Sequence, residues 1–183
     1  MAKSAAGYGQ SVQLGNAGEH LVMAHLLELG FQAFRADRAN PAFDISVVDG
    51  NRHSLIRVKA TRSPSVVWSR KKSGITFLDL RSRGDYCAIV DLRGGIAGAK
   101  IYIVPTPVVQ RAIDSGRREW NAGLKRDGSR RKDSTGQRLW LDDRDDLQAW
   151  RGYCKRWARY VENWDQLRSD RSRRNVGNKA KAT

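Results

Sequence analysis

Apolar residues recur three and four positions apart between Leu14 and Leu29, which is the spacing of one face of an α-helix. Gly30 follows this stripe directly and suits the left-handed conformation in which many helices end. The pattern therefore predicts a helix over residues 14–29. Residues 1–12 are small and polar without such a period, so they are predicted to be disordered.

After Gly30 the pattern changes to short apolar or alternating runs, which are typical of β-strands. Strands are predicted at residues 31–36, 43–48, 53–61, 75–80, 86–92 and 101–104, and helices at residues 107–115 and 145–167. Asp49-Gly50 is a hairpin signal, so the strands on either side of it should be neighbours. This order of elements predicts an α/β fold with a mixed β-sheet flanked by helices.

The 183 residues suffice for one domain with its own core, which we expect over residues 13–167. Within it, residues 117–138 are predicted to form a basic loop, and residues 168–183 a basic, disordered tail. No apolar stretch approaches the roughly 20 residues that cross a bilayer. Residues 1–13 lack the apolar run of a secretory signal, and the isolated Cys87 and Cys154 suit a reducing compartment, so a cytoplasmic protein is expected.

The net charge is +15 and the pI about 10.5, which favours a polyanionic partner, and DNA is expected rather than RNA. The excess charge lies in residues 61–110, 111–140 and 168–183 rather than at the two ends of the predicted core. Two clusters are candidate nucleic-acid-binding residues: Arg70, Lys71 and Lys72, and, in the predicted loop, Lys125, Arg126, Arg130, Arg131 and Lys132.

The alternation of the strand at residues 53–61 places Arg57 and Lys59 on a polar face, opposite to Ile56 and Val58. The predicted hairpin would bring Asp44 to that polar face. Glu19 lies within a turn of the apolar stripe of the first helix, where a carboxylate needs a compensating charge. That charge would be a metal ion or a cation at the sheet edge.

Three segments carry a resemblance to a known family: Gly15-Asn16-Ala17-Gly18-Glu19, Asp44-Ile45, and Ile56-Arg57-Val58-Lys59-Ala60-Thr61. In this order they resemble the core motifs of the PD-(D/E)xK nuclease superfamily, in particular small archaeal-type Holliday-junction resolvases and bacterial endonuclease-like domains. The likeness continues more loosely through residues 85–92 and 101–105 and covers about half of the chain.

The resemblance implies a restriction-endonuclease-like core and a metal-dependent endonuclease that hydrolyses phosphodiester bonds. In such an enzyme Glu19 and Asp44 would hold Mg²⁺ or Mn²⁺, which prefer oxygen ligands, and Lys59 would act on the attacking water or the transition state. Resolvases of this kind work on a junction as pairs, so the resemblance also implies a homodimer as one arrangement.

Arg57 departs from the motif because it occupies the position of the (D/E) ligand, and a guanidinium is a permanent cation without an acceptor. Three interpretations stay open. Asp79 or a backbone carbonyl replaces the missing ligand; or Arg57 pairs with Asp44 or Glu19 in an inactive protein that only binds nucleic acid; or Arg57 points at the scissile phosphate beside a weaker, one-metal site.

Aromatic residues recur at heptad-like spacing near the C-terminal end of the chain, at Trp150, Tyr153, Trp157, Tyr160 and Trp164. Such a stripe is expected to pack on the sheet, because buried Trp and Tyr rings contribute large apolar area. An exposed stripe would instead favour base stacking or a protein–protein adaptor.

Overall fold

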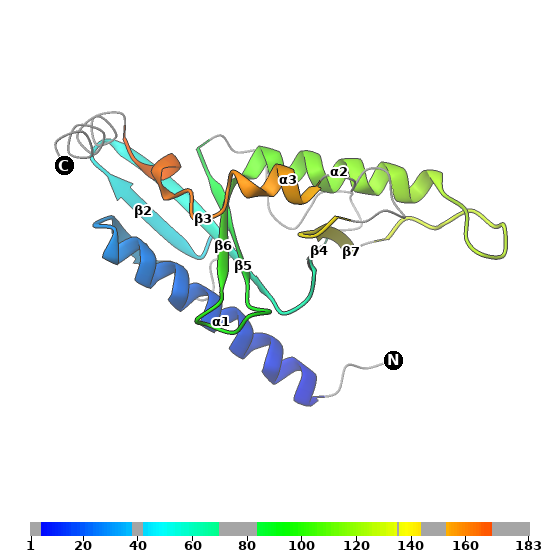
Figure 1. The fold of residues 1–183 in the computed structure, drawn as a ribbon, viewed down its shortest axis with the longest axis horizontal. Helices are drawn as coiled ribbons and strands as arrows, with labels where there is room; N and C mark the ends of the chain where they lie inside the picture. The colour runs from blue at the N-terminus through cyan, green and yellow to red at the C-terminus, as the bar shows by residue number, and fades with distance from the viewer. Residues whose placement is uncertain (1–4, 38–41, 70–83, 135, 144–152, 170–183) are drawn as a thin grey trace.

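The computed structural model describes residues 5–37, 42–69, 84–134, 136–143 and 153–169 (Figure 1). The helices are α1 (Ala5–Glu28), α2 (Thr106–Ala122) and α3 (Tyr153–Ala158), with a 3-10 helix at Trp164–Leu167. The strands are β1 (Gln32–Arg35), β2 (Ile45–Asp49), β3 (Arg52–Thr61), β4 (Ser65–Ser69), β5 (Tyr86–Asp91), β6 (Lys100–Pro105) and β7 (Gly136–Trp140).

The main sheet has five strands in the order β1-β2-β3-β5-β6. Its β3–β5 pair is parallel, and the β1–β2, β2–β3 and β5–β6 pairs are antiparallel. The predicted hairpin joins β2 to β3, with Gly50 at a φ of 62°. The predicted α/β fold with a mixed sheet flanked by helices is therefore confirmed.

Each face of the sheet has its own apolar core. On one face, Val22 and Leu26 of α1 pack against Ile45, Ile56 and other strand residues. On the other face lie α2, α3 and the small β4–β7 sheet, which Figure 1 shows on the side away from α1. The α1 helix lies close to β3, because a Cβ atom on Gly18 would be 2.7 Å from that of Ala60.

Helix α1 is longer than predicted, since it begins at Ala5. Residues 5–12, expected to be disordered, form its first turns. A helix that is already nucleated gains one hydrogen bond for each residue added, so small polar residues can extend it without an apolar stripe. The predicted helix end is confirmed, with Gly30 at a φ of 79°.

The predicted basic loop at 117–138 is shorter than expected. Helix α2 continues to Ala122, and β7 begins at Gly136. Strand β7 pairs with β4, which the sequence did not predict, and Trp68 and Leu139 of this pair are buried against α2. The pairing joins segments about 70 residues apart, so no local pattern could predict it. The predicted strand at residues 75–80 lies outside the described residues.

The predicted helix at 145–167 is also corrected, within the part of it that the structure describes. Helix α3 ends at Ala158, and the chain then turns before the 3-10 helix. Trp157 and Tyr160 are buried in the core under α2, whereas Trp164 is buried in the core under α1. For these three aromatics the expected packing on the sheet is confirmed, but on both faces of it, which argues against an exposed adaptor stripe there. Trp150 lies outside the described residues.

The chain crosses from one face to the other around the edge of β6. The backbone N–H of Ile103 donates to the Tyr160 carbonyl at 2.9 Å, and that of Glu162 donates to the Ile101 carbonyl at 2.8 Å. A carboxylate oxygen of Glu162 also accepts from the N–H of Ile101 at 3.0 Å. Residues 160–162 thus satisfy the outer edge of β6.

None of the helices in the described ranges has both the length and the apolar character that a membrane crossing requires.

Candidate functional site

Strand β3 separates an apolar from a polar face, as its alternation predicts. Ile56 and Val58 are buried beneath α1, while Arg57 and Lys59 are half-buried on the alternate positions. Asp44 precedes β2 and is tied to β3 by its backbone, since its N–H donates to the Ile56 carbonyl at 2.9 Å. Its side chain is tied as well, because Oδ2 accepts the N–H of Val58 at 2.7 Å.

Asp44 and Arg57 form an ion pair in which Nε lies 3.3 Å from Oδ2. The two side chains are only 17% and 18% exposed, so water screens this pair incompletely. The carboxylate oxygen that faces Arg57 is the same one that accepts the Val58 N–H. The structure therefore contains the Arg57–Asp44 pairing that one of the three interpretations of Arg57 assumes.

Lys59 lies beside this pair and is partly withdrawn from water. Burial and the positive charge of Arg57 lower the pKa of Lys59, and the negative charge of Asp44 opposes them in part. The ammonium lies 6.0 Å from the ring centroid of Trp68, a residue of the unpredicted strand β4. Cys87 of β5 is the register partner of Arg57, and burial raises the pKa of its thiol to about 12, so this thiol is neutral at physiological pH. Asp44, Arg57 and Lys59 thus form one cluster.

Glu19 has a different partner. Its Oε2 accepts a hydrogen bond from Nη2 of Arg35 at 2.8 Å. Arg35 belongs to β1, the edge strand of the main sheet. The expectation of a compensating charge beside Glu19 is met by a cation at the sheet edge.

The carboxylates of the described residues do not fit a resident divalent metal. Among these residues, no group of three acidic, histidine or cysteine side chains lies close enough to hold an ion. A cation at Asp44 would also meet the guanidinium of Arg57, which repels it and offers no acceptor. Asp79, the substitute ligand that the sequence offers, lies outside the described residues.

The predicted basic cluster lies in the segment that connects α2 to β7, while Arg70, Lys71 and Lys72 lie outside the described residues. Lys125, Arg126, Arg131 and Lys132 line an open pocket of about 460 Å³ together with Trp120. Arg131 stacks on the Trp120 ring at 4.0 Å and donates from Nε to the Leu124 carbonyl at 3.0 Å. The loop that carries these cations is thereby anchored to the end of α2.

The sequence analysis did not include Trp120, which lines this basic pocket and is 45% exposed. The predicted helix ended too early to include it. The run Arg117-Arg118-Glu119 contains good helix formers and would have extended that helix toward Trp120. Arg35 and Trp68 were missed because their partners, Glu19 and Lys59, come from distant segments.

No protein-family model matches the sequence, and no curated protein matches it. Among solved structures, the chain is similar to Hjc, a Holliday junction resolvase from the archaeal hyperthermophile Archaeoglobus fulgidus, with 15% identity and a TM-score of 0.41 over 69% of this chain and 83% of the resolvase. It is also similar to the bacterial homing endonuclease I-Ssp6803I, with 12% identity and a TM-score of 0.47 over 91% of this chain and 96% of that enzyme. The identity is low in both cases, so the chemistry of this chain rests on its own residues.

Proposed function

We propose that this protein is a nucleic-acid-binding module, for DNA before RNA, on a nuclease-like scaffold whose catalytic position is held by an arginine. The observation that carries the proposal is the Asp44–Arg57 ion pair, which puts a cation where a nuclease of the resembled family needs a metal ligand. The net charge of +15 supports a polyanionic partner. A cytoplasmic location and a homodimer stay predictions.

Arg57 and Lys59 give this site two cationic donors on the same face of β3. A guanidinium presents paired N–H groups that match two oxygens of a phosphate, and Asp44 holds that group in place. The lowered pKa of Lys59 means that its charge is costly in the free protein. A phosphate nearby would stabilise the ammonium, so binding should raise the pKa of Lys59.

The metal-dependent endonuclease is the second candidate function. The feature that favours it is Lys59, an ammonium of lowered pKa next to the carboxylate of Asp44, as the resemblance expects for a catalytic lysine. Mg²⁺ or Mn²⁺ would be its cofactor, and Glu19 and Asp44 its expected ligands. Since the described residues do not fit the metal, no catalytic step is assigned to it.

One experiment separates the two candidates. The protein is titrated onto labelled duplex, single-stranded and four-way-junction DNA and onto RNA, at several KCl concentrations, and the same mixtures are analysed for cleavage with EDTA, Mg²⁺ or Mn²⁺. The proposal expects binding that weakens with salt by about 0.9 in logarithmic slope for each phosphate contacted, without products.

Matched variants make either outcome decisive. Metal-dependent products that disappear in Asp44→Ala and in Lys59→Ala would establish the endonuclease. Products that survive both changes would indicate a contaminant. Absence of any salt-dependent binding to all four nucleic acids would overturn the proposed function.

A further inference from the structure

A groove of about 800 Å³ has α2 as one wall, and α3 together with the turn that follows it as the other. Five cationic side chains line it, and all five residues are exposed: Arg111, Arg118, Lys155, Arg156 and Arg159. Asp114 is the acidic residue among the groove's lining. The groove is therefore strongly positive, and it is separate from the Asp44–Arg57–Lys59 cluster and from the basic loop.

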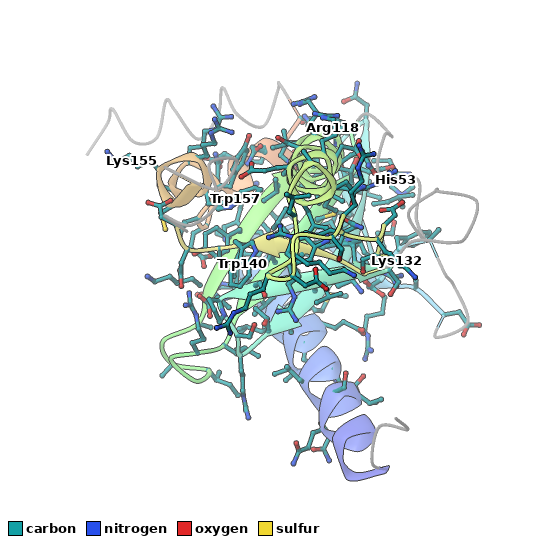
Figure 2. The ribbon with its side chains drawn as sticks, turned by 90° about the vertical axis from the view of Figure 1, so that its right-hand side faces the viewer. His53, Arg118, Lys132, Trp140, Lys155 and Trp157 are labelled. Carbon is teal, nitrogen blue, oxygen red and sulfur yellow. The ribbon has the colours of Figure 1, made fainter. Side chains whose placement is uncertain are left out.

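Helical spacing explains why these charges face the same space. Val109 and Ile113 turn inward to the core, so Arg111 and Arg118, seven positions apart, lie along the outer side of α2. On α3, Trp157 is buried and the flanking Lys155 is exposed. Figure 2, which looks along α2, shows Arg118 on α2 and Lys155 on α3 with Trp157 between the two helices.

The floor of the groove is fixed and offers no free aromatic face. Trp157 is 2% exposed and donates from Nε1 to the Trp140 carbonyl at 3.0 Å. Tyr160 is buried, and its hydroxyl accepts a hydrogen bond from Arg159 at 2.9 Å. Bases cannot stack on rings that are already covered, so the groove presents charge rather than an aromatic platform.

Five like charges in one groove repel each other unless an anion lies among them, and among the described lining residues the one carboxylate, that of Asp114, does not balance them. A chain of phosphodiesters supplies negative charges at regular spacing, and cationic side chains that contact phosphates carry no sequence information. We propose that the α2–α3 groove is a binding site for the phosphate backbone of nucleic acid that acts without regard to base sequence. This inference rests on the proposed function and names a surface for it.

The groove and the basic loop together would enlarge the surface that contacts the nucleic acid. Figure 2 shows Lys132 of the basic loop and Lys155 of the groove on opposite sides of α2. On the proposed function, a nucleic acid that reaches both surfaces spans α2, so the contacts made in the groove add to those made by the loop. Loss of the groove should therefore weaken binding even with the loop intact.

The test compares two double variants with the same loss of charge. Arg118→Ala with Lys155→Ala removes two groove cations. Arg62→Ala with Lys100→Ala removes an exposed arginine and lysine at the other end of the sheet from Pro105, where β6 leads into α2. Binding to two duplexes of unrelated sequence is measured by anisotropy across KCl concentrations. We expect the groove variant to lose about 2 from the salt slope and roughly tenfold in affinity on both sequences. The other variant should keep the wild-type slope.

A change of opposite sign completes the test. Asp114→Asn removes the groove's carboxylate and should strengthen binding severalfold, whereas Glu28→Gln, an equal change of charge at the exposed end of α1, should not. Thermal unfolding verifies that each variant is folded.

The failure of the groove and that of the proposed function look different. If the wild-type protein binds with a steep salt slope but the two double variants behave alike, the groove assignment is wrong and the proposed function stands. A groove variant that loses affinity for one duplex only would also overturn it, because the contact would then depend on sequence. If the wild-type protein binds no nucleic acid, the proposed function itself fails.

Discussion

Two arginine–aspartate clusters involve the central strands, one at Arg57 of β3 and one at Asp91, the last residue of β5, and they are built differently. In the first, Arg93 donates to Asp91 from Nε at 3.0 Å and from Nη2 at 2.6 Å, and to Asp142 from Nη2 at 3.0 Å. The Asp91 side chain is only 6% exposed. In the second, Arg57 approaches Asp44 at 3.3 Å, and the same carboxylate oxygen already accepts the Val58 N–H.

Protonation behaviour follows this difference. Burial raises the pKa of Asp91, but the hydrogen bonds and the charge of Arg93 outweigh burial and lower it. Hydrogen bonds to Asp91 and Asp142 raise the pKa of Arg93. In the second cluster, burial and the charge of Arg57 lower the pKa of Lys59. The Arg93 cluster is thus satisfied internally, whereas the Arg57 cluster keeps surplus positive charge that an external anion can stabilise.

The largest expected effect is on folding stability. Arg93→Ala removes the guanidinium and its hydrogen bonds from the buried Asp91 carboxylate, which keeps the backbone N–H of residue 93, and should cost about 3 kcal/mol of unfolding free energy. Arg57→Ala removes a longer contact of 3.3 Å and leaves Asp44 the hydrogen bond from the Val58 N–H, so it should cost less, about 1 kcal/mol. Urea unfolding measures both, with the exposed Arg62→Ala as the control. An Arg57→Ala loss as large as that of Arg93→Ala would make Arg57 a structural residue.

A smaller effect is expected from metal ions. Arg57→Asp places a second carboxylate beside Asp44 and removes the repelling cation, so Mg²⁺ or Mn²⁺ should stabilise this variant by about 1.4 kcal/mol at tenfold excess over the dissociation constant. Thermal unfolding with metal and with EDTA measures the difference. Arg57→Gln, which removes the cation without adding an acid, is the matched control. An equal metal response of the wild-type protein would contradict the present interpretation of Arg57.

The smallest effect is a pH dependence. Because the pKa of Lys59 is lowered in the folded protein, the unfolded chain holds more protons between that pKa and the ordinary value of 10.5. The free energy of unfolding should therefore rise with pH in this window, and Lys59→Met should flatten the rise, whereas the exposed Lys100→Met should not. Arg57→Ala removes a charge that lowers the pKa of Lys59, so an NMR titration should find that pKa raised. An unchanged pKa of Lys59 in this variant would show that the charge of Arg57 does not act on its ammonium.

Local patterns were sufficient for part of the site. The alternation of β3 predicted that Arg57 and Lys59 share a face, and the Asp49-Gly50 signal predicted the hairpin that brings Asp44 beside them. The possibility that Arg57 pairs with Asp44 came from its place in the resembled motif together with the chemistry of a guanidinium. Strand geometry by itself was sufficient only for the shared face and the hairpin.

Contacts between distant segments were not predictable in the same way. Strand β4 was missed because its partner β7 follows about 70 residues later, and with it Trp68, which packs near Lys59. The specific partner of Glu19 required knowing that β1 is an edge strand beside α1. The aromatic stripe was expected on one helix, but the turn after Ala158 divides it between two cores.

The passage of residues 160–162 around β6 determines where the chain can be shortened. These residues occupy a strand edge that would otherwise present unpaired backbone groups, which are a template for aggregation. Trp164 and Leu167 then complete the core on the α1 side. A truncation before Val161 would therefore expose unpaired backbone groups at the edge of β6 and remove Trp164 and Leu167 from the core. Such a fragment should be recovered as aggregate rather than as a smaller soluble protein.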